Sequence, residues 1–345
     1  MPKEKTTIYD IAARAEVSVA TVSRVINGTA SVAQGKRERV LAAINEADYR
    51  PSALARGLVS NRLCTIGLMV PDIADPYYAR LAFEIEQEAA AQGYSMLLHN
   101  TVYPRLSRVG ATDTPLLRRI RGLRADGFII TGDISDAIFP DISHENARDD
   151  VPFVTIGQTS RRANLPGVFC DVDYAIRSVV GHFDYSGYRS VGFITNRDGD
   201  GRDAFLEAAR ESGMQVKQEW NLSYGGSPEA GAAAMARLIA TGDIPRAIFA
   251  ANDMVAVGCL SACGEAGLSV PGDVALAGCG NTAVSMYTHP RLTTIDLHTA
   301  WVAREAVSCL LGLLDGRDAG GATDIRPDLV IRESSAPVRR GKARG

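Results

Sequence analysis

The chain has 345 residues, which is enough for two or three domains. Its 46% hydrophobic and 22% charged residues are ordinary for a globular protein, and its net charge of −3 excludes a protein that is basic throughout. The charge is unevenly distributed, because residues 1–62 hold ten lysines and arginines against six acidic residues. A basic head therefore precedes an acidic body, and we expect only the head to meet a polyanion.

Cysteine usage and the amino-terminal residues predict a cytoplasmic location. The cysteines lie in apolar stretches without a C-x-x-C pair; they are Cys64, Cys170, Cys259, Cys263, Cys279 and Cys309. Cys259 and Cys263 are four residues apart, but no histidine or acidic ligand accompanies them at metal-site spacing, so we expect buried free thiols, no metal and no cofactor. The start MPKEKTTIYD has no apolar signal-peptide core, and no run of eighteen apolar residues predicts a membrane partner.

Three short helices are predicted in the first 50 residues. Apolar residues recur at helical spacing after Thr7 and again after Ser18, and each of these residues is a suitable N-cap. A third helix is predicted over 34–47, and its inward-facing residues are Val40, Leu41 and Ile44. Two helices joined by a tight turn and followed by a third form a helix-turn-helix pattern.

From residue 65 onward, short apolar runs alternate with longer amphipathic stretches. The runs predict strands at 65–70, 94–100, 127–132, 153–157, 190–195, 247–252 and 274–280. Alternation of strands and helices is typical of doubly wound α/β domains with parallel sheets. The number of repeated units favours two similar lobes over one very wide sheet.

Several phrases in order resemble the lac repressor (LacI/GalR) family of bacterial transcription regulators. They are TIYDIAARAEVSVATVSRVIN, YRPSALARGL, IGLMVPDIADPYYARL, AANDMVAVG and THPRLTTI. The resemblance runs from Thr7 to about Ala336. It implies a DNA-binding helix-turn-helix domain over 1–50, a hinge over 51–62, a core over 63–336 and a flexible tail over 337–345.

The resemblance also implies a core like that of periplasmic sugar-binding proteins, built from two doubly wound lobes. The chain is expected to cross between the lobes near 162, 291 and 325, so lobe 1 is formed by about 63–162 and 292–324 and lobe 2 by about 163–290 and 325–336. A small-molecule effector, a sugar or related metabolite, is expected in the cleft between them. The implied assembly is a homodimer on a near-palindromic double-stranded DNA operator, acting by default as a repressor.

The same resemblance assigns DNA contacts in the head and hinge. The implied base-reading residues are Val19, Ala20 and Arg24. The implied phosphate contacts are Tyr9, Ser18, Thr21, Ser23, Asn27 and Tyr49. In the hinge, Leu58 matches a leucine that enters the minor groove, and Ala55 lies beside it. The alternatives are a solvated helix face for the polar residues and packing on the lobe for Leu58.

The implied effector contacts follow strand ends of the core. They are Asp75, Tyr77, Tyr78, Asn252 and Asp253, although interlobe packing is an alternative role for either tyrosine. Two carboxylates usual in the family are absent, at Gly157-Gln158 and at Gly278-Cys279-Gly280-Asn281, and a usual arginine is displaced to Arg202. The candidate replacements are Gln158, Arg202 and Asn281, and the loss of the carboxylates removes acceptors suited to vicinal sugar hydroxyls.

Two other classes of protein are compatible with an α/β core. An enzyme is disfavoured because the chain lacks a G-x-S-x-G turn, a P-loop, a G-x-G-x-x-G turn after a strand, and clustered histidines. A solute-binding protein would leave residues 1–62 without a purpose. We therefore expect a DNA-binding regulator rather than an enzyme.

Overall fold

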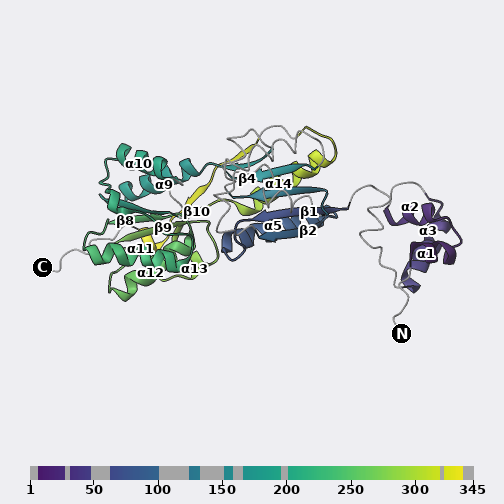
Figure 1. The fold of residues 1–345 in the computed structure, drawn as a ribbon, viewed down its shortest axis with the longest axis horizontal. Coiled ribbons are helices and arrows are strands. Elements are labelled where there is room, and N and C mark those ends of the chain that lie inside the picture. Colours follow the sequence, from purple (N-terminus) through teal and green to yellow (C-terminus); the bar gives the residue numbers. More distant parts are fainter. Residues whose placement is uncertain are drawn as a thin grey trace, which may run out of the picture.

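The computed structural model describes residues 7–27, 32–47, 63–100, 124–132, 151–157, 166–195, 201–318 and 322–336. These residues form a small helical head and two α/β lobes (Figure 1). The predicted hinge over 51–62 and the predicted tail over 337–345 lie outside the described residues.

The head consists of α1 (Ile8–Arg14), α2 (Val19–Asn27) and α3 (Gln34–Glu46). Thr7 caps α1 in a capping box with Asp10, and the Ser18 hydroxyl accepts a 3.3 Å hydrogen bond from the Thr21 backbone N–H, so both predicted N-caps are present. The head core is Ile11, Ala12, Ala15, Val22, Val25, Val40 and Ala43. The inward position predicted for Leu41 is wrong, because this side chain is 45% exposed and Ala43 takes the buried place on α3.

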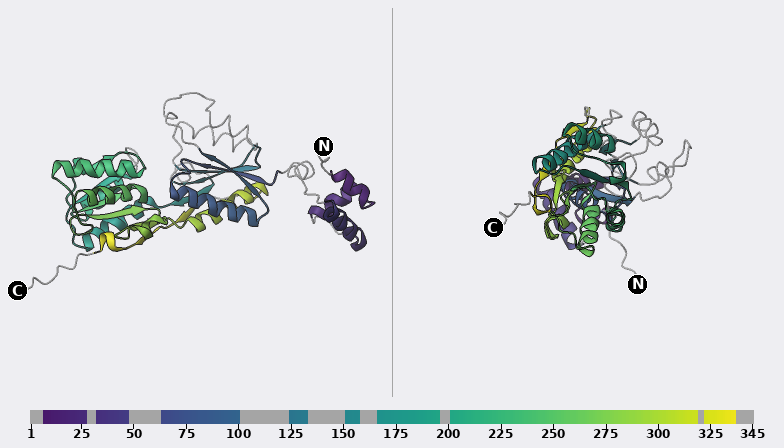
Figure 2. Two further views of the ribbon diagram at one scale, coloured as in Figure 1. Left: turned by 90° about the horizontal axis from the view of Figure 1, so that it is seen from below. Right: turned by 90° about the vertical axis from the view of Figure 1, so that its left-hand side faces the viewer.

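Lobe 1 is built on a sheet of six parallel strands in the order β11-β5-β4-β3-β1-β2. The strands are β1 (Thr65–Val70), β2 (Ser95–Asn100), β3 (Gly127–Thr131), β4 (Phe153–Ile156), β5 (Gly167–Cys170) and β11 (Thr323–Ile325). Helices α5 (Pro76–Ala91) and α14 (Thr299–Leu314) pack against each other and lie side by side on this lobe (Figures 1 and 2).

Lobe 2 has a sheet in the order β12-β10-β9-β8-β6-β7, parallel except for β12, which is antiparallel to β10. The strands are β6 (Val191–Thr195), β7 (Asn221–Ser223), β8 (Ala247–Ala250), β9 (Ala275–Cys279), β10 (Thr293–Asp296) and β12 (Asp328–Val330). The helices are α9 (Val172–Tyr185), α10 (Arg202–Glu211), α11 (Pro228–Thr241), α12 (Asp253–Glu265) and α13 (Val284–Tyr287), with 3-10 turns at Gln218–Trp220 and Glu333–Ser335.

The two lobes share one strand order. In each sheet the first strand lies beside the second and the third, and the fourth and fifth follow outward. This order reverses direction next to the first strand, and in such sheets ligands bind outside the carboxyl ends of the strands at that point. The predicted pair of similar doubly wound lobes is therefore confirmed.

The chain changes lobe later than the sequence indicates at two of the three crossings. Gly167–Cys170 pair with β4 and belong to lobe 1, although they lie in the segment predicted for lobe 2. Thr293–Asp296 pair with β9 and belong to lobe 2 rather than lobe 1. Two polar threonines interrupt the apolar run of β10, so the apolar pattern did not reveal this strand, whereas β5 is as apolar and as short as the predicted strands β4 and β8.

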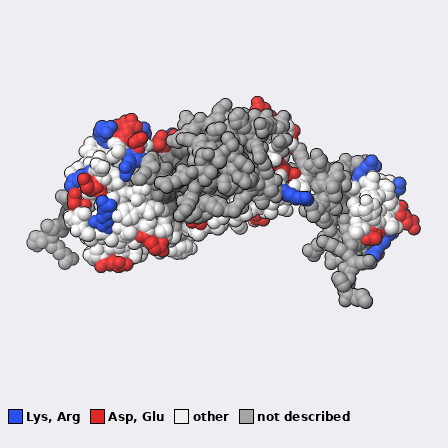
Figure 3. Space-filling model, viewed as in Figure 1, with Lys and Arg blue, Asp and Glu red and all other residues white. Residues whose placement is uncertain are grey.

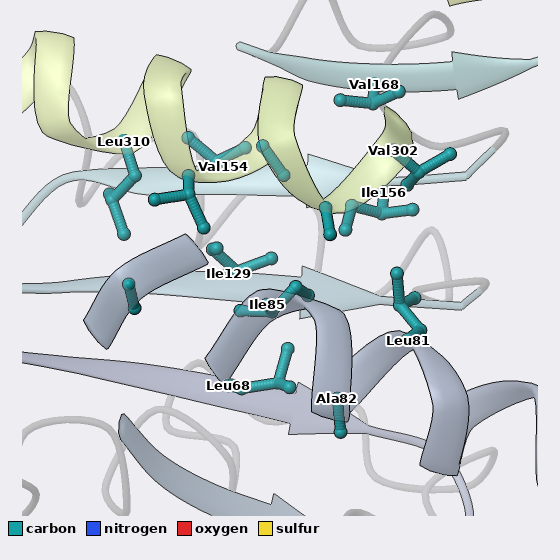
Figure 4. Close-up of a cluster of buried hydrophobic side chains, with 14 of the residues drawn as sticks. Leu68, Leu81, Ala82, Ile85, Ile129, Val154, Ile156, Val168, Val302 and Leu310 are labelled. Carbon is teal, nitrogen blue, oxygen red and sulfur yellow. The ribbon is translucent and has the colours of Figure 1, made fainter. Parts of the chain in front are cut away.

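The core of lobe 1 lies between the sheet and the α5–α14 pair. Leu81 and Ile85 of α5 and Val302 and Leu310 of α14 face strand residues such as Ile129 (Figure 4). All five are completely buried. Because α5 begins at the loop after β1, this packing fixes the residues at its first turn, which face lobe 2.

Charges of both signs are mixed on the face of lobe 2 in view and on the described part of the head (Figure 3). Several head cations, including Lys3, Lys5, Arg50 and Arg56, lie outside the described residues. Among the described residues, no helix is long and apolar enough to cross a membrane.

Candidate interlobe cleft and nucleic-acid interface

Asp75 stands at the amino end of α5 and faces lobe 2. Its Oδ1 atom accepts a 2.9 Å hydrogen bond from the Tyr77 backbone N–H, and Pro76 occupies the first helical turn. Burial raises the pKa of the Asp75 carboxyl, and the nearby carboxylates Asp72 and Asp253 act in the same direction, against the hydrogen bonds from Tyr77 and Asn252. The structure therefore places this predicted effector contact at the boundary between the lobes.

Asn252 is the matching residue of lobe 2, directly before α12. Its Oδ1 atom accepts a 2.7 Å bond from the Val255 N–H and so caps the helix. Its Nδ2 atom donates to the Gly226 carbonyl at 3.0 Å and to Asp75 Oδ2 at 3.4 Å. Asn252 and Asp75 thus join the two lobes directly at the ends of β8 and β1.

Tyr77 and Tyr78 pack edge to face, with ring centroids 5.1 Å apart, and both contact the lobe 1 core. A Cβ atom at Gly280 of lobe 2 would lie 3.8 Å from Tyr77 Cβ. Burial raises the pKa of Tyr77 well above its usual value, so its hydroxyl stays protonated. Tyr77 therefore lies against lobe 2. This position is the one that the alternative role, packing between the lobes, requires of one of the two tyrosines.

Asp253 is 1% exposed, and its carboxylate is occupied within the protein. Oδ2 accepts hydrogen bonds from the Thr282 N–H at 2.7 Å and the Thr282 hydroxyl at 2.8 Å, and Oδ1 accepts one from the Thr294 hydroxyl at 2.5 Å. Burial raises its pKa, and these bonds oppose the rise. This arrangement differs from that of a residue which offers free oxygens to a ligand.

Asn281 is also engaged by neighbouring side chains. It has a left-handed backbone with φ of 45°, and its Nδ2 atom donates to Asp296 Oδ2 at 3.0 Å. Arg332 donates to Asn281 Oδ1 at 2.6 Å and to the Leu292 carbonyl at 2.7 Å. Sequence reasoning missed Arg332, which approaches from the last segment of the chain, and no spacing signal relates it to Asn281.

Arg202 begins α10 and donates to the Asn221 carbonyl of β7 at 3.1 Å. Within the described part of the chain, Arg202 Nε and Asn221 Oδ1 are buried without a hydrogen-bond partner. Gln158 lies outside the described residues. Of the two candidate replacements that the structure describes, Asn281 is tied to the strand ends at β9 and β10 and Arg202 to β7.

Two thiols lie near the interlobe contacts. Burial raises the pKa of Cys170, at the end of β5, to about 12, and raises the pKa of Cys279, at the end of β9, further. The Cys170 thiol lies 4.0 Å from the Leu297 carbonyl at the second crossing. Both thiols are protonated at neutral pH, as expected for structural cysteines.

The head presents its predicted base-reading residues unequally. Ala20 and Arg24 of α2 are exposed, whereas Val19 is partly buried against the head core. Tyr9 is 72% exposed. Ser23 is only 9% exposed, so its burial does not support the phosphate contact predicted for it.

Other predicted DNA contacts have a mixed outcome. Ser18 and Thr21 lie at the amino end of α2, with their hydroxyl oxygens 3.0 Å apart. The backbone of Asn27 ends α2, but its side chain is not described. Tyr49, Ala55 and Leu58 lie outside the described residues.

Comparisons with known proteins agree with this architecture. Residues 7–52 match the model of bacterial regulatory proteins of the lacI family, and residues 180–335 match a periplasmic binding protein-like domain. The chain is 31% identical to the transcriptional repressor PurR of Proteus mirabilis, covering 96% of this chain and 97% of that protein. It is 31% identical to the catabolite control protein A of Priestia megaterium, covering 84% and 86%.

Solved structures show the same fold. A lac repressor dimer bound to operator and the anti-inducer ONPF has a TM-score of 0.82 at 24% identity, over 96% of this chain and all of that chain. The regulator CelR in complex with cellobiose has a TM-score of 0.66 at 24% identity, over 95% and 99%. Fold and site define a two-lobed ligand-binding core with a helix-turn-helix head. The chain belongs to the lacI family of bacterial regulatory proteins, whose named relatives here are regulators and not enzymes.

Proposed function

We propose that this protein is a sequence-specific DNA-binding transcriptional repressor whose operator affinity is controlled by a small molecule between its lobes. The observation that carries the proposal is the presence, in one chain, of a helix-turn-helix head with Arg24 exposed on its second helix and a two-lobed core with polar residues at facing strand ends. The repressor names of the full-length relatives support it. The protein acts in the cytoplasm, where it meets chromosomal DNA.

In the head, Arg24 reads a base in the major groove. Its guanidinium can form two parallel hydrogen bonds to guanine O6 and N7. Ala20 lies on the same exposed part of α2 and supplies apolar contact, while Ser18 and Thr21 stand at the helix end where backbone and hydroxyl donors favour phosphate. Hinge residues Ala55 and Leu58 enter the minor groove beside this site.

The protein acts as a homodimer on a near-palindromic operator. Phe83 of α5 is 53% exposed, and Leu97 and Leu98 of the edge strand β2 are 40% and 44% exposed. Apolar side chains exposed on two adjoining elements are typical of an association surface, and a second copy of the chain is the proposed occupant. The lac repressor relative is a dimer on its operator.

The effector is a sugar or a related metabolite held between Asp75, Tyr78 and Asn252. Asp75 offers acceptor oxygens, and the Asn252 Nδ2–H that meets Asp75 can be donated to an effector hydroxyl instead, a combination suited to hydroxyl groups. The CelR relative holds cellobiose. Asp253 does not contact the effector. Its hydrogen bonds with Thr282 and Thr294 instead hold the start of α12, which follows Asn252.

The proposal is tested by selecting bound DNA from a random-sequence pool with the full-length protein. A near-palindromic consensus is expected, and Arg24→Ala should weaken binding to the selected site by about 1–3 kcal/mol while changing binding to unrelated DNA little. Lys36→Ala, which removes a head cation outside α2, is the control and should weaken binding to both DNAs similarly. A pool without consensus, or an equal loss on both DNAs for Arg24→Ala, would contradict the proposal.

A further inference from the structure

The two lobes contact each other through side chains at the ends of β1 and β8 as well as through the chain crossings. Asp75 Oδ2 of lobe 1 accepts from Asn252 Nδ2 of lobe 2 at 3.4 Å, and Tyr77 lies against Gly280. The Asn252 amide also donates to Gly226, so its position is fixed by lobe 2 independently of Asp75. A change that affects Asp75 alone therefore alters the contact between the lobes without displacing Asn252.

We propose that Asp75 and Asn252 form an interlobe latch that responds to protonation of Asp75, so that the lobes close more readily as the pH falls. A proton bound to Asp75 then favours closure of the lobes in addition to the effector. Its role in regulation rests on the function proposed above.

The physical reason lies in what closure does to the Asp75 carboxylate. Closing the lobes removes it from water, and burial is the largest influence on its pKa, which is raised. Among the residues that the structure describes, the charged groups that act on it are the carboxylates Asp72, in the same loop, and Asp253, at the start of α12 in lobe 2, and both oppose ionisation. The remaining titratable neighbours, Tyr77 and Cys279, have raised pKa values and stay neutral.

The direction of the effect follows from linkage. The closed form holds the Asp75 proton more tightly than an open form in which the carboxyl is hydrated near its ordinary pKa of 3.8. Protonation of Asp75 therefore stabilises the closed form fully below that ordinary value. This stabilisation is lost as the pH rises through the raised pKa of the closed form. A protonated carboxyl keeps an acceptor oxygen, so the bond from Asn252 can persist.

Hydrogen exchange of the full-length protein tests the latch without DNA or effector. Rates for peptides spanning 72–78, 224–230 and 250–256 are measured from about pH 4, near the ordinary pKa of an aspartate, to pH 7.5 and divided by the intrinsic rate at each pH. The wild-type protein should lose protection in all three as the pH rises. Asp75→Asn keeps an N-cap residue but cannot titrate, so its protection should not change with pH.

Two further variants complete the test. Glu86→Gln removes an exposed carboxylate of the same helix, α5, and should lose protection with pH as the wild type does. Asn252→Ser keeps a capping hydroxyl but is too short to reach Asp75, so 72–78 should be less protected at every pH. The latch is overturned if wild-type protection is independent of pH, if Asp75→Asn retains the dependence, or if Asn252→Ser leaves 72–78 unchanged. Because this experiment uses no DNA, its result is separate from that of the DNA-selection experiment that tests the proposed function.

Discussion

At the scale of single residues, two adjacent polar side chains at one strand end have different roles. Asn252 caps α12 and reaches across to lobe 1, whereas Asp253 turns inward to Thr282 and Thr294. Through these bonds Asp253 ties the start of α12 to the loop after β9 and to β10. It holds in place the segment that carries Gly280 and Asn281.

Asp253→Ala should destabilise lobe 2 strongly. The substitution leaves two hydroxyls and a backbone N–H without their acceptor, and unsatisfied buried groups cost about 1–3 kcal/mol each. We expect the free energy of unfolding to fall by roughly 2–5 kcal/mol in urea denaturation. The exposed Asp203→Ala on α10 is the control, with a loss of about 0.5 kcal/mol or less, and equal losses in the two variants would refute the role of Asp253.

These residues also show what the sequence can reveal about the site. The strand-end positions of Asp75, Asn252 and Asn281 follow from the α/β pattern and the family resemblance. The inward turn of Asp253 does not, because it depends on threonines 29 and 41 residues away in the chain. The threonines in the apolar phrase THPRLTTI were the one available signal of a buried polar partner.

At the scale of elements, α11 and α12 pack with their backbones in contact. A Cβ atom at Gly258 of α12 would lie 1.8 Å from the Pro228 carbonyl oxygen, and one at Gly231 of α11 would lie 2.1 Å from the Val255 carbonyl oxygen. Facing glycines therefore permit the close approach. Since α12 begins next to Asn252, this packing sets the position of the lobe 2 side of the cleft.

Gly258→Ala should force the two helices apart. Overpacking of this kind costs typically about 1–3 kcal/mol, and contact with backbone rather than a flexible side chain places the expected loss at or above about 3 kcal/mol. Gly264→Ala is a matched control on the same helix, because nothing lies within 4 Å of its added Cβ, and it should be neutral or stabilise by up to about 1 kcal/mol. Thermal unfolding measures both, and similar melting temperatures for the two variants would contradict the close packing.

The elements themselves were predicted unevenly. The seven apolar runs each correspond to a strand, and six of these strands are buried and read as continuous apolar segments, whereas the edge strand β2 is largely exposed. At the crossings, β10 was missed because it carries buried threonines, and β5 was missed although it is as apolar and as long as the predicted strands β4 and β8. Leu41 was misplaced because helical spacing alone does not show which side of α3 the neighbouring helices cover.

At the scale of the whole molecule, the two lobes are separate α/β units joined by the chain crossings. Among the described residues, the lobes meet at the ends of β1 and β8 through the 3.4 Å hydrogen bond between Asn252 and Asp75 and the approach of Tyr77 to Gly280. Each lobe, by contrast, has its own fully buried core. A ligand that binds both lobes therefore shifts their relative position, and its binding and DNA binding influence each other reciprocally.

The most direct test of this account is the affinity of the full-length protein for DNA from the region upstream of its own gene. Fluorescence anisotropy compares this DNA with a shuffled sequence of the same composition at about 50 and 200 mM salt. We predict binding at least about 1,000-fold tighter to the upstream DNA, weakening steeply with salt on both sequences. Equal affinity for the two sequences would contradict sequence-specific regulation by this protein.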